Sequence, residues 1–214
     1  MPIALQAVAV YVHRDNPLNG MTLDEADAIF SQTQHRGLAE EITTWGQVGL
    51  DGEWVNTPIR LYGRDQTSGT RSFVRDQLLL NGEFKKTIKE VPGAAMVIME
   101  VARDRYGIGY SGIGYQASSV RALPLGKKRG MPFVSPSAES ATDGSYPLTR
   151  LLYLYVNMPP KQKRDPVILE FLKFVNSHEG QETVVKAGVY PLPIKHIAAN
   201  VSLLSQGTIT ANIP

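Results

Sequence analysis

The segment most suggestive of chemistry is a run of ten residues, Gly63–Ser72, with the sequence GRDQTSGTRS. It follows an expected strand at residues 58–62 and leads into an expected helix at residues 72–80. The first turn of a helix has N–H groups without internal partners and carries the positive end of the helix dipole. A strand, a glycine- and hydroxyl-rich turn and a helix start therefore predict a site for an anion.

The side chains of this segment suit the same chemistry. Arg64 has a planar guanidinium group that can bind two oxygens of a phosphate or carboxylate at once. Thr67, Ser68 and Thr70 add hydroxyl donors, and Gly69 lets the backbone approach a ligand closely. An ordinary capped helix with surface arginines fits the local pattern equally well, so the pattern leaves both interpretations open.

Composition describes an ordinary globular protein. The chain has 214 residues, 43% hydrophobic and 20% charged, which allows one large domain or two small ones. A net charge of +2 argues weakly against nucleic-acid binding, and the densest basic cluster, Lys127–Arg129, is expected in a solvated loop. No run approaches the roughly 18 apolar residues that would span a bilayer. The first eight residues lack the pattern of a signal peptide, so we expect either a cytoplasmic protein or one whose leader is absent from the sequence.

Cofactor and metal chemistry has little support. The chain has no cysteine, which excludes disulfides, thiol catalysis and cysteine-bound metals. Its four histidines are far apart without paired spacing, so we expect no metal ligands. The pattern Gly107-x-Gly109-x-x-Gly112 matches the dinucleotide fingerprint, but no helical start follows it and residues 129–136 contain no carboxylate. We therefore expect no cofactor and take these glycines as positions of close backbone packing or bends.

Strand and helix patterns alternate along the chain and predict an α/β fold. Thr22 and Glu25 form a capping box that opens a helix, and Asp165-Pro166 is a cap with a first-turn proline. The other expected elements are strands at 8–12, 120–125 and 151–156, helices at 94–103, from 166 and at 181–187, and a loop-rich stretch at 126–145. On the helix from 166, the expected apolar stripe is Ile168, Phe171, Leu172 and Val175.

Several segments taken together resemble the periplasmic phosphate-binding proteins of ABC transporters, which are type II solute-binding proteins. The matching segments are Asp15–Leu18, Met21–Leu23, Ile29–Ser31, Ile42–Gly46, Gly63-Arg64, Ser68–Thr70, Gly107–Tyr110, Asp143–Leu148, Arg150, Glu179–Gln181 and Gly188–Leu192. They cover nearly the whole chain in the family's order. The Ser-Gly-Thr loop after an arginine is the most specific of them.

The resemblance implies an α/β fold of the type II periplasmic-binding-protein kind, with a ligand buried between two lobes. Residues 14–150 are then one complete lobe that carries the anion loop. Residues 1–13 and 151–214 are the crossover strands and C-terminal helices of a second lobe that lacks the N-terminal segment of family members. The implied ligand-binding residues are Arg64, Gln66, Thr67, Ser68, Gly69 and Thr70. Many members have an aspartate where this chain has Gln66, which puts a preference for phosphate over sulfate in doubt.

The implied function is capture of inorganic phosphate or a related oxyanion and its delivery to an ABC permease in the membrane. The resemblance also implies a periplasmic location, no catalytic residues and no cofactor. With half of the anion site missing, we expect weakened binding and self-association, as a homo-oligomer, through the incomplete lobe. Two alternatives stay open: an enzyme that processes phosphate esters, with Asp65 as a conceivable nucleophile, and a divergent or truncated sensor or interaction domain without ligand binding.

Overall fold

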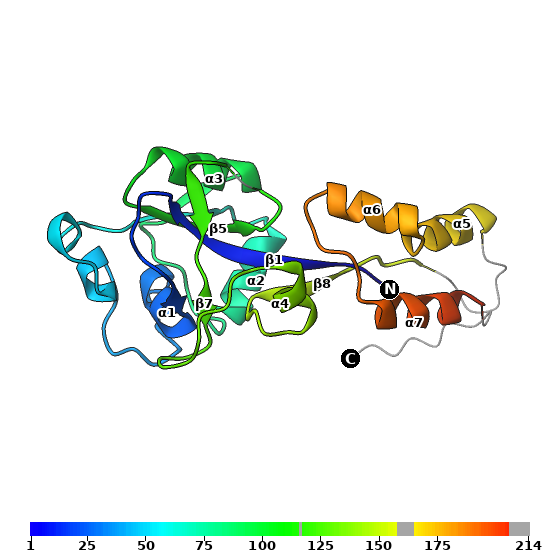
Figure 1. The fold of residues 1–214 in the computed structure, drawn as a ribbon, viewed down its shortest axis with the longest axis horizontal. Coiled ribbons are helices and arrows are strands. Elements are labelled where there is room, and N and C mark those ends of the chain that lie inside the picture. The colour runs from blue at the N-terminus through cyan, green and yellow to red at the C-terminus, as the bar shows by residue number, and fades with distance from the viewer. Residues whose placement is uncertain (116, 158–164, 206–214) are drawn as a thin grey trace. The chain divides into compact units, whose positions relative to one another are not determined.

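The computed structural model describes residues 1–115, 117–157 and 165–205 and contains two compact units. Ala7–Thr149 forms the larger unit, and Met1–Gln6 together with Arg150–Pro214 forms the smaller one. Both units combine helices with strands (Figure 1), which confirms the predicted α/β class. Within the described ranges, no helix is long and apolar enough to cross a membrane.

A mixed sheet is the centre of the larger unit. Its strands run in the order β4 (Lys89–Val91), β3 (Arg60–Arg64), β5 (Gly107–Gly112), β1 (Pro2–His13) and β6 (Val120–Ala122). β3 is parallel to both β4 and β5, whereas β1 is antiparallel to β5 and to β6. A second, two-stranded parallel sheet joins β2 (Met21–Thr22) to β7 (Leu125–Gly126).

Helices cover both faces of this sheet (Figure 1). They are α1 (Leu23–Phe30), α2 (Gly69–Gln77), α3 (Ala94–Arg103) and the short α4 (Ala138–Thr142), with 3-10 turns η1 (Trp45–Val48) and η2 (Gly52–Trp54). Successive residues of a strand point to opposite faces. Gly109 accordingly lies against Val97 of α3, while the ring of Tyr110 packs edge-on against Phe30 of α1. β5 is buried along its whole length, and an added Cβ would lie 2.8 Å from a neighbouring atom at both Gly107 and Gly109, which confirms the predicted close packing at these two glycines.

The smaller unit contains residues 2–6 of β1, most of β8 (Thr149–Tyr153) and three helices. These helices are α5 (Pro166–Val175), α6 (His178–Lys186) and α7 (Ile194–Ser205). Buried Asn200 of α7 donates from Nδ2 to the Pro2 carbonyl at 2.8 Å and to Asn176 Oδ1 at 2.7 Å. Asn176 in turn donates to the Leu172 carbonyl at 2.8 Å, so one amide network ties β1, α5 and α7 together.

The predicted helix starts are confirmed where a cap specifies them. Thr22 Oγ1 accepts from the Glu25 amide and the Glu25 carboxylate accepts from the Thr22 amide, which completes the capping box. Asp165 accepts from the Val167 amide at 2.8 Å and opens α5.

Other boundaries differ from the prediction. The strand expected at 58–62 is β3, which ends at Arg64, and the strand expected at 151–156 is β8, which begins at Thr149. The strand expected at 120–125 is interrupted between β6 and β7, and the loop-rich stretch at 126–145 contains α4. α7 was not anticipated from the sequence.

Candidate functional site

The candidate site lies at the edge of the sheet where the three parallel strands end. β3 ends at Arg64, β4 at Val91 and β5 at Gly112, so their carboxyl ends meet on one side. Two helices begin there: α2 follows β3, and α3 follows β4 after Pro92-Gly93. In open α/β sheets, ligands bind outside the carboxyl ends of the strands. The topology therefore places the segment 64–70 where a ligand would be expected.

Asp65 shapes the turn between β3 and α2. Its Oδ1 accepts from the Thr67 amide at 3.2 Å and from Thr67 Oγ1 at 2.8 Å, and its carbonyl accepts from the Ser68 amide at 3.2 Å. An aspartate that binds the backbone two residues ahead is a standard turn former. In this structure the Asp65 carboxylate holds the turn in shape, while Gln66 and Thr67 are exposed to solvent.

Ser68 is the N-cap of α2, which begins at Gly69 rather than at the predicted Ser72. The buried Ser68 Oγ accepts from the amides of Thr70 at 3.2 Å and Arg71 at 3.4 Å. These bonds are longer than the usual 2.9–3.0 Å and are therefore weak. Two amides of the first helical turn are thus occupied inside the loop, and an anion there would have to compete with Ser68 for them.

Arg64 has an incomplete set of hydrogen bonds. Its Nη2 donates to the carbonyl of Pro92 at 2.9 Å, whereas its Nε is buried and has no acceptor in the described part of the chain. A buried donor without an acceptor costs about 1–3 kcal/mol, and more when the group is charged. An anion that accepted from this N–H would remove that cost.

Arg71 is a site residue that the sequence analysis missed. Its Nη1 donates to the Arg64 carbonyl at 3.0 Å and forms an ion pair with Glu90 at 2.9 Å. Its guanidinium lies over the ring of Phe84, 4.3 Å from the centroid. Arg71 thereby fixes the end of β3, and Glu90 balances its charge. Its position in the first helical turn, after a capping serine, is the signal that could have identified it.

Tyr110 lies next to this cluster on β5. Its ring stacks on Phe84 at 5.7 Å between centroids, and its buried hydroxyl has no hydrogen-bond partner among the described residues. A Cβ added at Gly63 would lie 2.9 Å from that hydroxyl, so the glycine leaves room for it. Burial raises the pKa of Tyr110 to about 12, with the positive charge of Arg71 opposing the shift. The phenol is therefore neutral at pH 7.

The predicted site residues lie next to one another along the backbone, but they do not all contact one another. Ser68, Gly69 and Thr70 form the start of α2, and Arg64 precedes them at the end of β3. No hydrogen bond given for the described residues joins the Arg64 guanidinium to the turn. Nor do any three His, Asp or Glu side chains of the described ranges gather as a metal site would require.

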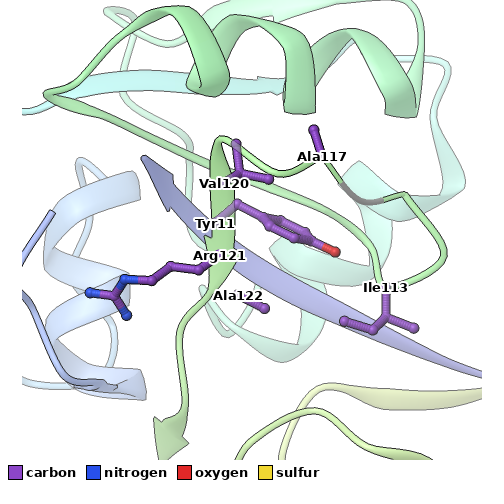
Figure 2. A pocket seen from close by; sticks show the side chains of 6 residues that line it. All are labelled: Tyr11, Ile113, Ala117, Val120, Arg121 and Ala122. Atoms are coloured by element: carbon purple, nitrogen blue, oxygen red, sulfur yellow. The ribbon is translucent and has the colours of Figure 1, made fainter. Parts of the chain in front are cut away.

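A cavity of about 250 Å³ lies elsewhere in the larger unit (Figure 2). Its walls come from β1, β6 and the residues after β5: Tyr11, Ile113, Ala117, Val120, Arg121 and Ala122. Figure 2 shows the Arg121 guanidinium directed away from the Tyr11 ring, and it donates to the carbonyls of Asn16 and Leu18. The cavity shares no residue with the segment 64–70.

Comparisons with known proteins give the family context. The model of a family described as "PBP superfamily domain" matches residues 1–179. The phosphate-binding protein PstS of Pseudomonas aeruginosa PAO1 is 45% identical over 195 residues, which are 91% of this chain and 60% of that protein. Protein SphX of Synechococcus elongatus is 28% identical and matches 93% of this chain and 57% of its own length. The chain thus spans about 60% of the length of these curated relatives.

Solved structures show the same fold. A possible phosphate-binding protein from Planctomyces limnophilus superimposes with a TM-score of 0.74 at 23% identity, over 97% of this chain and 72% of that one. A putative phosphate ABC transporter substrate-binding protein from Clostridium perfringens, solved with bound phosphate, gives 0.70 at 22% identity, over 90% and 71%. This likeness confirms the predicted periplasmic-binding-protein-like fold.

Proposed function

Because the chain belongs to the PBP superfamily, we propose that it is the anion-binding part of a phosphate solute-binding protein, with the ligand held at residues 64–70. The observation that carries this proposal is the buried Nε of Arg64, which has no acceptor among the described residues at the edge where ligands of such sheets bind. The relatives named phosphate-binding proteins support inorganic phosphate or a similar oxyanion as the acceptor.

Each residue of the site has a distinct role in this proposal. Arg64 supplies a charge-assisted N–H, and the hydroxyls of Ser68 and Thr70 donate to further oxygens. Gly69 presents open space, since a Cβ there would meet nothing within 4 Å. Gln66 and Thr67 are exposed on the turn and line the outer side of the site. The whole arrangement binds without catalysis.

We further propose that the two compact units correspond to the two lobes of a clamp, with residues 14–150 as the anion-binding lobe. A phosphate dianion leaves water only when nearly all its oxygens are hydrogen-bonded. Each charge-assisted hydrogen bond returns about 1.5–3 kcal/mol, whereas micromolar affinity needs about 8 kcal/mol. The donors of residues 64–70 all belong to one lobe. We therefore expect them alone to give weak binding of phosphate, in the millimolar range (about 4 kcal/mol).

Delivery to an ABC permease in a membrane completes the proposed function and places the protein in the periplasm. A solved structure from Vibrio cholerae with the same fold is described as an ABC-type phosphate transport receptor, in line with delivery to such a permease. Co-purification with the cognate permease, gained only when phosphate is present, is the expected behaviour of such a receptor.

Calorimetric titration with phosphate, at matched ionic strength, tests the site. We expect weak saturable binding by the wild type and a loss of about tenfold or more, corresponding to at least about 1.4 kcal/mol, in Arg64→Ala. Arg75→Ala is the matched control, because Arg75 lies exposed on α2 and pairs only with the neighbouring Asp76 among its described contacts. Equal effects of the two variants, or no heat of binding at about 10 mM phosphate, would contradict the proposal.

A further inference from the structure

The charged side chains around the proposed anion site cancel one another. The turn and the first turn of α2 carry two arginines, Arg64 and Arg71, and one aspartate, Asp65. Glu90 supplies a second carboxylate from β4, the strand next to β3. The formal charges of these four side chains sum to zero, so together they give the site no net positive charge to attract an anion.

Glu90 influences the site through Arg71. Arg71 Nη1 lies 2.9 Å from Glu90 Oε1 and donates to the Arg64 carbonyl at 3.0 Å, so one nitrogen links the carboxylate to the backbone of the site. The side chains of Arg71 and Glu90 are 17% and 33% exposed, and solvent therefore screens their interaction only in part. The ring of Phe84 lies under the guanidinium and helps to hold it in place. Glu90 thus takes up a positive charge that would otherwise act on a ligand.

The size of this effect depends on the charge of the ligand. The interaction of a fixed charge with an anion is proportional to the charge of that anion. A carboxylate beside the site therefore penalises a dianion twice as much as a monoanion, whereas the N–H and O–H donors of the loop serve the oxygens of both. Gln66 has no formal charge and can both accept and donate, so it does not set such a preference.

We propose that Glu90 determines the charge specificity of this site: by neutralising Arg71 it shifts the preference from doubly to singly charged oxyanions, such as dihydrogen phosphate. This role of Glu90 rests on the proposed function, because it needs an oxyanion bound at residues 64–70. Glu90 acts through Arg71 and does not contact the ligand. It is therefore a positioning residue, and its test needs a measurement that a merely structural role would leave unchanged.

The ratio of phosphate affinity to sulfate affinity is such a measurement. Calorimetric titrations at about pH 5.5 and about pH 8.5 compare phosphate as mainly a monoanion and as mainly a dianion. Sulfate stays a dianion at both pH values, so dividing by its affinity cancels any titration of the protein. In Glu90→Gln we expect sulfate to bind about tenfold and monoanionic phosphate about threefold more tightly than in wild type. The ratio then falls about threefold at pH 5.5 and stays unchanged at pH 8.5.

Glu100→Gln is the matched control. It removes the same charge from the ion pair of Glu100 with Lys89, whose Nζ lies 2.8 Å from the carboxylate. Lys89 precedes Glu90 on β4, and successive residues of a strand point to opposite faces. We therefore expect the affinity ratio of this variant to equal that of wild type at both pH values.

Arg71→Gln tests the same charge balance from the opposite side and serves if Glu90→Gln does not fold. It leaves Glu90 uncompensated, so the ratio at pH 5.5 should rise about threefold. The double variant Arg71→Gln/Glu90→Gln lacks the ion pair but again has a zero sum of charges. Its ratio should return to the wild-type value, which a loss of structure alone would not produce.

The outcomes separate this role from the proposed function. If wild type binds neither anion, or if Arg64→Ala binds both as well as wild type, the proposed function fails and the role of Glu90 fails with it. Binding that is lost in Arg64→Ala establishes the site. If the ratio at pH 5.5 is then the same in Glu90→Gln as in wild type, or changes equally in Glu100→Gln, the role of Glu90 alone is overturned.

Discussion

Two buried polar atoms at the carboxyl edge of the sheet, Nε of Arg64 and the hydroxyl oxygen of Tyr110, have no hydrogen-bond partner within the described residues. Their physical situations differ. An arginine stays charged at every accessible pH, so its unpaired N–H has a persistent cost that a bound anion would remove. A buried phenol can stay neutral, and its cost appears only when high pH forces it to ionise.

Removal of the Tyr110 hydroxyl should change how stability depends on pH. The folded pKa of about 12 exceeds the ordinary value of 10.0, so the folded protein holds this proton more tightly than the unfolded chain. The contribution of this proton to the free energy of unfolding is fully present below pH 10. It is lost as the pH rises through 12, and its total is about 2–3 kcal/mol. In Tyr110→Phe we expect a smaller loss of unfolding free energy between pH 9 and pH 12 than in wild type.

Urea unfolding at several pH values measures this difference. At pH 7 the variant should be within about 1 kcal/mol of wild type or more stable, because the hydroxyl it lacks has no partner. Tyr62, whose pKa is also raised by burial and by its hydrogen bond to Asp104, contributes the same background to both proteins. Parallel pH profiles for the two proteins would show that Tyr110 is not buried as described.

At the scale of whole elements, the packing of α3 on strand β5 depends on a glycine in the strand. A Cβ on Gly109 would lie 2.8 Å from a methyl carbon of Val97 and 3.0 Å from the Tyr62 carbonyl oxygen. The missing side chain therefore lets α3 pack directly on the strand, beside the strand that carries Arg64. Glycine is usually unfavourable within a strand, and close approach of another backbone is the usual reason for its presence.

Gly109→Ala should destabilise the larger unit by about 1–3 kcal/mol, because the added methyl group must displace α3 or β3. Gly69→Ala is the control: it lies at the first position of α2 with open space around it, and alanine favours a helix by up to about 1 kcal/mol. Thermal unfolding followed by the fluorescence of Trp45 and Trp54, both in this unit, reports the difference. A Gly109→Ala protein as stable as Gly69→Ala would show that α3 does not pack tightly there.

The elements show which features of the fold could be predicted from the sequence. Capping is local, so Thr22 with Glu25 and Asp165 with Pro166 identified their helix starts correctly. The stripe predicted for α5 is right for Leu172 but wrong for Phe171, which is half exposed. Hydrophobic periodicity cannot assign the inner side of a helix that is apolar on both sides. The expected start of α2 at residue 72 was also late, because Ser68 caps the helix earlier than its apolar pattern begins.

Only the part of the candidate site that lies within one short segment of the chain could be predicted from the sequence. The turn and helix start at residues 64–70 follow from residue types along one short segment, and the structure has both. Glu90 and Tyr110 could not be predicted, because they meet the end of β3 only after three strands have paired. Their assembly is a consequence of sheet topology, which no local spacing encodes.

At the scale of the whole molecule, the chain consists of two compact units, and β1 contributes residues to both of them. The smaller unit depends on a buried amide network, in which Asn200 bonds to Pro2 and Asn176. Gln181 Nε2 of α6 also donates to the Ile3 carbonyl of β1 at 3.1 Å.

Asn200→Ala should loosen the smaller unit selectively. It leaves a backbone carbonyl and an amide oxygen of the network without this donor, each at a cost of about 1–3 kcal/mol. In hydrogen exchange we expect faster exchange for α5 and α7, while the amides of β3 and β5 in the larger unit keep their protection. Lys195→Ala, an exposed substitution on the same helix, is the control. Equal loss of protection in both units would contradict the description of two units with separate stability.

The most direct test of the central claim is a nitrogen–proton NMR titration of the chain with phosphate, following side-chain and backbone N–H groups at once. The account predicts that the Arg64 Nε–H and the amides from Ser68 to Arg71 shift together and saturate with one binding constant. It also predicts that Arg75 Nε–H stays unchanged and that chloride at equal ionic strength has no effect. If Arg64 stays unmoved while phosphate shifts other groups, or if all arginines respond alike, the oxyanion is not bound at residues 64–70.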